Sequence, residues 1–273
     1  RCLVGSEMCI RDSFYMFIWI WSLIAVITFC YLFFVTAPYG RHVSSNWGPS
    51  MSARTGWIVM EAPSVFFIAY LFFIFKEQTS TTTIIFLCIW LLHYTHRTLI
   101  WPFQADMHGK TMPVLVAGLA FIFNIFNVLF QAAWLLLLQE YDAAWLLSAP
   151  FIFGIIIFVI GFYINIKSDY LLINLRKTSG SGYHIPRGFL YEKISSPNYF
   201  GEILEWLGWT VMTWSPSGAV FLAWTIANLF PRSVANHKWY LQTFDEYPPD
   251  RKAILPYIYL SLIHISEPTR HLL

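Results

Sequence analysis

The chain has 273 residues, of which 57% are hydrophobic, 19% are aromatic and only 12% are charged. Because a soluble domain carries about 25% charged residues, this composition predicts a membrane protein. The net charge of +2 is too small to indicate a nucleic-acid partner, and no basic run alternates with aromatic residues as a nucleic-acid groove requires.

The two ends of the chain are unlike the residues between them. Residues 1–13, RCLVGSEMCIRDS, and residues 260–273, which include SLIHISEPTRHLL, are polar and aperiodic and resemble translated adapter sequence. The first of these tails also lacks the small-residue cleavage site that follows the apolar core of a signal peptide. We therefore expect residues 14–259 to form a single domain, with both tails outside its fold.

Four cysteines occur, Cys2, Cys9, Cys30 and Cys88, and no two of them form a CxxC pair. This spacing predicts neither a zinc site nor a disulfide framework. Two of them, Cys30 and Cys88, lie inside apolar runs, where cysteine packs as a small apolar residue. We therefore expect no metal site.

Seven apolar segments fit membrane helices, each of which needs ~20 mostly apolar residues. In chain order they are residues 14–35, 57–75, 83–101, 114–138, 144–166, 199–214 and 218–230. The last two are short and are separated by the turn Ser215-Pro216-Ser217, so we expect them to form a helical hairpin. The sequence predicts an all-α membrane protein with seven transmembrane helices.

Basic residues in the predicted connections indicate the orientation, because alternate connections lie on opposite sides of the membrane. Twelve basic residues fall on one side: Arg41, Arg54, Lys110, Lys167, Arg176, Lys177, Arg187, Lys193, Arg232, Lys238, Arg251 and Lys252. The other side has Lys76 alone, together with the acidic turn at residues 139–142. Since basic residues favour the cytoplasmic side, we expect the N-terminus outside and the C-terminus in the cytoplasm.

Several predicted spans carry polar or ionisable residues. They are Glu61, His93, Tyr94, His96, Arg97, Asn124, Asn127, Gln131, Glu202 and Glu205. Ionisable groups inside a bilayer are costly and usually face the interior of the bundle or a watery cavity. This set therefore indicates either buried ion pairs that join helices or a functional cavity.

Helical spacing shows which of these residues share a face in the third span. Tyr94 and Arg97 are separated by three positions, and His93 and Arg97 by four, so both pairs lie on one side of a helix. Arg97 has two interpretations of equal weight. It pairs with Glu61 or Glu202 to hold helices together, or it has a function in the cavity.

The second span has a single acid, Glu61, between Trp57 and Pro63. An isolated carboxyl group in an apolar helix is expensive for packing alone, which favours a functional role. The fourth span differs, because three amide side chains fall on one helix face, at Asn124, Asn127 and Gln131. For these we favour structural hydrogen bonds between helices.

The long connection after the fifth span contains a second polar stripe. Asn165, Asp169, Leu172 and Arg176 fall on one face of a helix that continues out of the span, followed by KTSGSGYHIPRG at residues 177–188. Glycine lets backbone amides approach a phosphate closely. This loop is nevertheless neither a GxGxxG fingerprint nor a Walker motif, and an ordinary hydrophilic loop is the alternative.

A third stripe enters the membrane at SPNYFGEILEWLGW, where Asn198, Glu202 and Glu205 share a face beside Trp206 and Trp209. These acids either hold the hydroxyl or amide groups of a cofactor or extend toward the membrane interface.

Long motifs in the C-terminal half resemble the steroid 5α-reductase family. They are PRGFLYEKISSPNYFGEILEWLGWTVMTWS and KWYLQTFDEYPPDRKAILPYIY; NIKSDYLLINLRK and HYTHRT resemble earlier segments of that family. The resemblance covers residues 54–259, and NYFGE is shared with other membrane sterol reductases and isoprenylcysteine methyltransferases. It implies a seven-helix membrane enzyme that uses NADPH to reduce the C4–C5 double bond of a 3-oxo-Δ4 steroid.

The resemblance also implies roles for individual residues. Glu61 and Tyr94 would hydrogen-bond the 3-keto oxygen of the substrate, and Trp57 would line the same pocket. The dinucleotide would be held by Arg97, Lys110, Asn165, Asp169, Arg176, Tyr183, Asn198, Glu202, His237 and Tyr240. The sequence departs from the family pattern at Lys110, where the family has Arg, and at Trp101 and Asn236, where Tyr and a His-rich run are common.

Chemistry and location agree with this resemblance. Donors at the ketone oxygen stabilise the negative charge that develops when an enone is reduced, and Tyr94 is a natural donor, whereas Glu61 donates only when protonated. NADPH would bind from the cytosol, and the steroid would enter from the bilayer, in the endoplasmic reticulum of a eukaryote or the inner membrane of a bacterium. We expect contact with membrane lipid and no obligate protein partner.

Three alternative functions remain open from the sequence. One is an enoyl-CoA or polyprenol reductase of the same fold, and another is an S-adenosylmethionine-dependent membrane methyltransferase. The third is a receptor, photoreceptor or transporter with seven helices. The last span has no lysine for a retinal Schiff base, and the chain shows no pair of related halves with broken helices.

Overall fold

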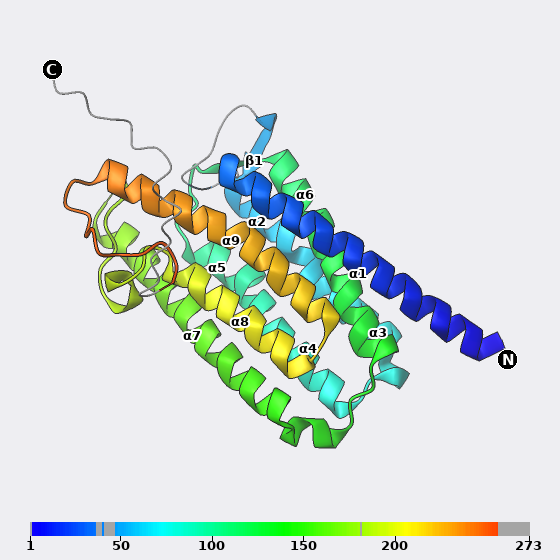
Figure 1. The fold of residues 1–273 in the computed structure, drawn as a ribbon. Coiled ribbons are helices and arrows are strands. Elements are labelled where there is room, and N and C mark those ends of the chain that lie inside the picture. Colours follow the sequence, from blue (N-terminus) through cyan, green and yellow to red (C-terminus); the bar gives the residue numbers. More distant parts are fainter. Residues whose placement is uncertain (1, 37–39, 41–46, 181, 256–273) are drawn as a thin grey trace.

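The computed structural model describes residues 2–36, 40, 47–180 and 182–255, with side chains from Met8 onward, and it is mostly helical (Figure 1). The α-helices are α1 (Cys2–Phe34), α2 (Ala53–Ala62), α3 (Ile68–Ile74), α4 (Thr81–Thr95), α5 (Trp101–Gln104), α6 (Val114–Ala133), α7 (Ala149–Thr178), α8 (Pro197–Thr213) and α9 (Pro216–Thr243). Two short antiparallel strands, β1 (Ser50–Ser52) and β2 (Thr111–Pro113), pair with Met51 opposite Met112.

Short π-helical and 3₁₀-helical segments lie between the helices in the part of the chain that the structure describes. The π turns are η3 (Pro63–Phe67), η5 (His96–Ile100) and η6 (Trp134–Leu138), and the 3₁₀ turns are η4 (Lys76–Gln78), η7 (Ala143–Leu147) and η8 (Phe189–Glu192). The turn η3 joins α2 to α3, and η5 joins α4 to α5, so each pair forms one continuous helical span.

Five helical segments within the described residues are long and apolar enough to cross a membrane. They are Met8–Phe34, Ala53–Ile74, Thr81–Gln104, Val114–Leu138 and Ala149–Thr178. Helix α8 has 17 residues, fewer than the ~20 that a span needs, and α9 turns polar after Phe230. An all-α membrane fold is therefore supported, whereas the count of seven spans and the orientation stay predictions.

Several helix ends differ from the predicted bounds. Helix α1 begins at Cys2, so residues 2–13 form its first turns, whereas their foreign origin and their place outside the domain stay predictions. Helix α7 begins at Ala149 because Ser148 caps its first turn, and the preceding residues form the 3₁₀ turn η7. Helix α9 runs through Pro231 to Thr243. The predicted tail at residues 260–273 lies outside the described residues.

The π turns place backbone carbonyl oxygens where side chains of other helices reach them. The indole nitrogen of Trp57 donates to the carbonyl oxygen of Arg97 in η5 at 3.0 Å. In the same way, the indole nitrogen of Trp90 donates to the carbonyl oxygen of Ser64 in η3 at 2.9 Å. Turns of this type are common at functional sites, and here they tie α2 to the α4–η5 segment.

A row of glycines brings the backbones of α7 and α8 into direct contact. The four glycines are Gly154 and Gly161 in α7 and Gly201 and Gly208 in α8. A methyl group added to Gly201 would lie 2.5 Å from the backbone nitrogen of Asn165, and the other three glycines leave equally little space. Small residues of this kind allow close helix packing in membranes, and here they set the polar stripes of α7 and α8 side by side.

The hairpin between α8 and α9 agrees with the prediction. Helix α8 ends at Thr213 and is followed by Trp214, which has a left-handed backbone with a φ of 46°. Ser215 then caps α9 by accepting a hydrogen bond from the Gly218 amide at 2.9 Å. Pro216 occupies the first turn of α9, where its missing amide costs nothing. Two residues therefore suffice to reverse the chain.

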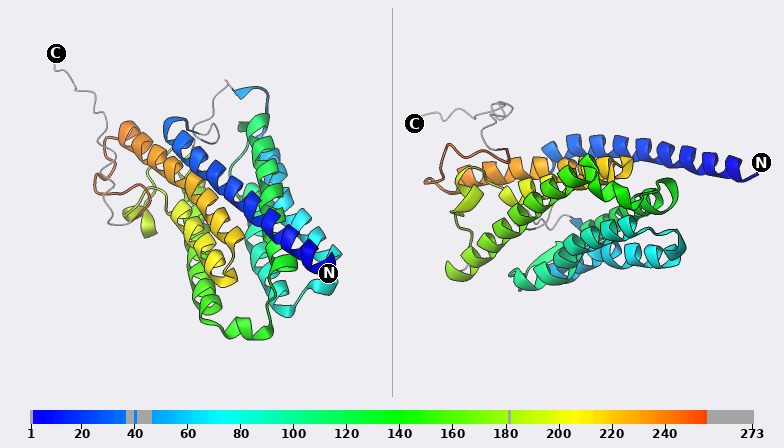
Figure 2. Two further views of the ribbon diagram at one scale, coloured as in Figure 1. Left: turned by 45° about the vertical axis from the view of Figure 1, so that its right-hand side comes forward. Right: turned by 90° about the horizontal axis from the view of Figure 1, so that it is seen from below.

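Figures 1 and 2 show α1 lying alongside α9, with its start and the end of α9 at opposite ends of the molecule. The connections before α2 and α6 meet through β1 and β2, and Ile194, in the connection before α8, forms a bridge with Lys252. These contacts join connections that the sequence places on the same side of the membrane. A buried aromatic core of Trp90, Trp206 and Phe221 lies between the helices, with ring centroids 4.5 Å apart for the last two.

Candidate active site

Two cavities meet inside the helical bundle. One has a volume of about 440 Å³ and many polar side chains, and the other has a volume of about 520 Å³ and is lined mostly by apolar residues. Trp57, Arg97 and Met112 line both cavities. The geometry therefore offers a polar chamber and an apolar chamber that share one wall.

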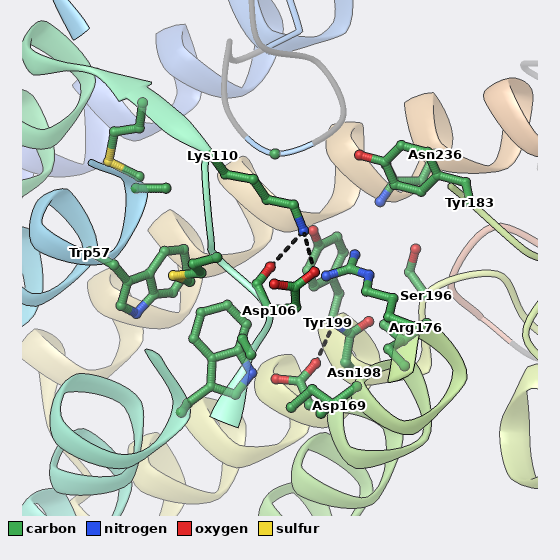
Figure 3. A pocket seen from close by; sticks show the side chains of 18 of the residues that line it. Trp57, Asp106, Lys110, Asp169, Arg176, Tyr183, Ser196, Asn198, Tyr199 and Asn236 are labelled. Atoms are coloured by element: carbon green, nitrogen blue, oxygen red, sulfur yellow. Dashed lines mark hydrogen bonds and ion pairs between the residues drawn. The ribbon is translucent and has the colours of Figure 1, made fainter. Parts of the chain in front are cut away.

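The polar cavity lies between the α5–β2 connection, α7, the start of α8 and the end of α9 (Figure 3). It collects most residues that the sequence assigns to a dinucleotide. These are Arg97, Lys110, Asp169, Arg176, Tyr183, Asn198 and Tyr240. The predicted stripe of Asn165, Asp169, Leu172 and Arg176 on α7 is thus confirmed in part, because its last three members all line this cavity.

Arg97 lies at the junction of the two cavities and is held on several sides. Its guanidinium contacts Asp169 at 3.4 Å and Glu202 at 3.6 Å. It also lies over the rings of Trp57 and Trp101, at 4.7 and 5.0 Å from their centroids. Glu202 is one of the two predicted partners of Arg97. The contact with Asp169 places the guanidinium between α7 and α8.

Asp169 and its neighbours form a chain of hydrogen bonds between α7 and α8. The side-chain nitrogen of Asn198 donates to Oδ1 of Asp169 at 2.9 Å, and the side-chain nitrogen of Asn165 donates to the backbone carbonyl oxygen of Asn198 at 3.0 Å. Asn165 itself does not line either cavity. It instead fixes the start of α8, which in turn positions the carboxyl group of Asp169.

Two basic residues, Lys110 and Arg176, face each other across the polar cavity. The Lys110 ammonium donates to the carbonyl oxygen of Asp106 at 2.6 Å and lies 3.8 Å from its carboxylate (Figure 3). Partial burial, and then the charge of Arg176, lower the pKa of Lys110, while Asp106 opposes this effect. A second cation close enough to lower this pKa marks a position where an anion is stabilised.

Besides Asn165, two of the residues predicted to hold the dinucleotide lie outside the polar cavity. Glu202 pairs with Arg97 and lines the apolar cavity, not the polar one. His237 lines neither cavity and is buried behind Ser195, with its Nδ1 atom 2.6 Å from the serine hydroxyl. Burial, together with the charge of Lys252, lowers the pKa of His237 to about 4.

The polar cavity also has lining residues that the sequence did not assign to a ligand. They are Ser195, Ser196, Tyr199, Arg232 and Asn236. The guanidinium of Arg232 donates to the hydroxyl group of Tyr199 at 3.1 Å, which joins α9 to α8. No helical stripe marks these residues, although Tyr199 and Asn236 stand directly next to the assigned positions Asn198 and His237 in the chain.

The apolar cavity contains the predicted substrate residues Trp57, Glu61 and Tyr94, which come from α2 and α4. Residues of α1, α6 and α9 form its other walls. The side-chain amide of Asn124 donates to Glu61 Oε2 at 3.3 Å and to the Met60 carbonyl oxygen at 2.7 Å. Asn124 therefore makes the predicted contact between helices and also orients the Glu61 carboxyl group.

On the same stripe of α6, Gln131 makes the predicted contacts between helices, whereas Asn127 accepts a hydrogen bond from Gln131 of its own helix and its side-chain nitrogen has no partner among the described residues. Gln131 donates to the Ser217 carbonyl oxygen at 2.9 Å and accepts from the Trp209 indole at 3.0 Å. Among the described residues, no group of three or more His, Cys, Asp or Glu side chains is suited to hold a metal ion.

Comparison with known proteins decides the family. Residues 110–259 match the family described as 3-oxo-5-alpha-steroid 4-dehydrogenase. Over 236 residues the chain is 42% identical to Steroid 5-alpha-reductase DET2 of Arabidopsis thaliana, covering 83% of this chain and 89% of that protein. The chain belongs to the steroid 5α-reductase family.

A mammalian member of the steroid 5α-reductase family gives the same result. Over 223 residues the chain is 39% identical to 3-oxo-5-alpha-steroid 4-dehydrogenase 1 of Homo sapiens, covering 81% of this chain and 86% of that protein. The resemblance seen in the sequence is therefore confirmed, and the chain is an oxidoreductase. Its five apolar helical spans make it an integral membrane protein.

Proposed function

We propose that this member of the steroid 5α-reductase family uses NADPH to reduce the C4–C5 double bond of 3-oxo-Δ4 steroids. The observation that carries the proposal is the meeting of two cavities at Trp57 and Arg97. One cavity has an acid and a phenol in apolar surroundings, which suits a steroid ketone. The other has cations and amides, which suit a dinucleotide.

Glu61 and Tyr94 polarise the ketone in this proposal. Negative charge develops on the 3-keto oxygen during reduction, and a donor already aimed at that oxygen stabilises it without rearrangement. The Tyr94 hydroxyl is one donor, and the carboxyl group of Glu61 is the second when it is protonated. Asn124 contacts Oε2 of Glu61, so the other oxygen is free to face the substrate.

The polar cavity fits an anionic dinucleotide. Lys110, Arg176 and Arg232 line it and provide positive charge for phosphate groups, while Asp169 and Asn198 offer an acceptor and a donor for amide or hydroxyl groups. When bound, a reduced nicotinamide supplies the hydride that adds to C5. Arg97 stays charged at every physiological pH, so it orients and neutralises charge and does not transfer a proton.

We also propose a direction of access for each ligand. We propose that the polar cavity opens to the cytosol, where NADPH is found, and that the steroid enters from the bilayer. The host membrane is the endoplasmic reticulum in a eukaryote or the inner membrane in a bacterium. Enoyl-CoA reduction is the main alternative, and a ketone held by two donors favours the steroid over a bulky thioester.

Oxidation of NADPH by the purified protein, with and without a 3-oxo-Δ4 steroid or an enoyl-CoA, tests the proposal. We expect Glu61→Gln and Tyr94→Phe each to lower steroid turnover about 10²–10³-fold, as loss of one oxyanion donor does. NADPH binding should be unchanged. Glu77→Gln and Tyr70→Phe are matched controls, because both residues are exposed and line neither cavity. Turnover of the enoyl-CoA alone would contradict the proposal.

A further inference from the structure

A buried pair of ionisable groups lies beside the apolar cavity and has no part in the mechanism above. Nδ1 of His93, on α4, is 2.7 Å from Oε1 of Glu205, on α8. The side chains are 4% and 0% exposed, so neither is solvated from outside the protein. The two residues are 112 positions apart, and only the packed helix bundle brings them together.

Helix packing alone does not account for this pair. Replacing a buried ion pair by apolar residues is often neutral or stabilising, so such a pair is weak evidence for a structural role. Oε2 of Glu205 is also buried and has no hydrogen-bond partner among the residues that the structure describes. An unpaired oxygen costs less on a neutral carboxyl group than on a carboxylate, which fits an arrangement where the pair shares one proton.

The location of His93 connects the pair to the substrate. His93 lines the apolar cavity together with Glu61 and Tyr94. Its ring centroid is 4.9 Å from that of Tyr94 and 4.6 Å from that of Trp206, which fixes the plane of the imidazole. Since C4 of a 3-oxo steroid is bonded to the ketone carbon, a group that protonates C4 must lie next to the residues that hold the ketone.

We propose that His93 donates the proton that C4 receives, and that Glu205 is the positioning residue that orients His93 and restores its proton. The inference rests on the proposed function and names the proton source for that reaction. Contact between Glu205 and Nδ1 leaves the Nε2 nitrogen to carry the transferable proton toward the cavity.

The proton and the electrons balance over one turnover. The hydride adds to C5 with its electron pair, the C4–C5 π electrons form a C3–C4 double bond, and the ketone oxygen becomes negative. The C3–C4 π electrons then take the Nε2 proton to form the C4–H bond, and the C3 carbonyl is restored. The proton shared with Glu205 moves to Nδ1 and leaves a carboxylate. Water then returns a proton to Nε2, and the Nδ1 proton moves back to Glu205, so both residues regain their starting protonation before the next turnover.

Other titratable groups near the pair have different tasks or lie outside the cavity. The neighbouring charged and titratable groups are Glu61, Tyr94, His96, Arg97 and Glu202. Glu61 and Tyr94 hold the ketone oxygen, Glu202 is paired with Arg97, and His96 does not line the apolar cavity. Tyr31 also lines this cavity, but it is 51% exposed, so His93 is the buried cavity-lining acid that the reaction has not otherwise used.

Two substitutions remove the transferable proton and retain a polar contact, namely His93→Gln and Glu205→Gln. We expect each to lower kcat about 10²–10⁴-fold, the usual effect of losing a general acid, with the KM for the steroid and the Kd for NADPH unchanged. The solvent deuterium isotope effect on kcat should increase, because proton transfer becomes the slow step. Trp209→Phe is the matched control: it removes a buried hydrogen bond one turn further along α8, and it should lower thermal stability without changing kcat or the isotope effect.

The outcomes are distinguishable. Wild-type kcat in both variants, with steroid reduction intact, overturns the inference and leaves the proposed function standing. A loss of kcat accompanied by an unchanged isotope effect and a fall in stability like that of the Trp209 variant also overturns it, because the pair would then be structural. If the wild-type protein reduces no 3-oxo-Δ4 steroid, both proposals fail together.

Discussion

Replacing Asp169 by Asn tests whether the hydrogen-bond chain between α7 and α8 prepares the cofactor site. The substitution keeps the size of the side chain and an oxygen acceptor for Asn198, whose side-chain nitrogen donates to Asp169 at 2.9 Å in the wild-type protein. It removes the negative charge that lies 3.4 Å from the guanidinium of Arg97. Arg97 would still have Glu202 at 3.6 Å and two indole rings, so we expect Arg97 to stay in the junction in a less defined orientation.

The size of the effect follows from the burial of these groups. The Asp169 and Arg97 side chains are only 6% and 13% exposed, so the lost contact resembles a buried hydrogen bond to a charged group, worth ~1.5–3 kcal/mol. If Arg97 must be oriented for binding, this corresponds to roughly 10- to 150-fold weaker NADPH binding.

Equilibrium titration of NADPH fluorescence with the purified protein measures this change. Asp106→Asn is the matched control, because Asp106 lines the same cavity but is 57% exposed and lies 3.8 Å from Lys110. An exposed pair contributes up to ~1 kcal/mol, so the control should weaken binding less than about 5-fold. Equal affinities for the Asp169 variant and the wild type would refute the reasoning.

Three further predictions concern packing, acid stability and cofactor choice. Gly161→Ala should lower the free energy of unfolding by ~1–3 kcal/mol in a chemical unfolding assay, because the added methyl group meets the α8 backbone. Gly118→Ala is the control: no atom lies near its added methyl group, and alanine favours the helix, so this change should raise the free energy of unfolding by up to ~1 kcal/mol. Folding lowers the pKa of His237 from its ordinary value of 6.5 to about 4, so the folded protein binds fewer protons between these pH values than the unfolded chain does. The neutral His237 therefore contributes its full stabilisation above pH 6.5, and this contribution is lost as the pH falls toward 4. His237→Asn should therefore flatten thermal stability between these pH values, and an unchanged slope would contradict this. If the Lys110 ammonium contacts the 2′-phosphate of NADPH, Lys110→Ala should weaken NADPH binding about 10-fold and leave NADH binding unchanged. Equal losses for both cofactors would place that phosphate elsewhere.

The apolar runs determined the helices, because a chain in hydrocarbon must satisfy its backbone groups within each span. Helical periodicity also placed Asp169, Leu172 and Arg176 on one face, and these three residues line the polar cavity. A stripe shows only which direction a residue faces on its own helix. It predicted a shared face for Asn165, which lies behind the cavity and supports Asn198. The end of α9 was missed because that helix continues beyond its apolar run as a polar helix, whereas the polar stripe had already predicted the continuation of α7.

Contacts between helices required the tertiary structure. The sequence named Glu202 as a partner for Arg97 but had no means to choose Asp169, because that contact depends on how closely α7 approaches α8. The glycine row sets that approach, whereas Glu205 meets His93 where α8 lies against α4. Hydrophobicity and periodicity act along the chain, so they determine helices and their faces. The distances between side chains on different helices follow from the depth of helix packing, which only the assembled bundle decides.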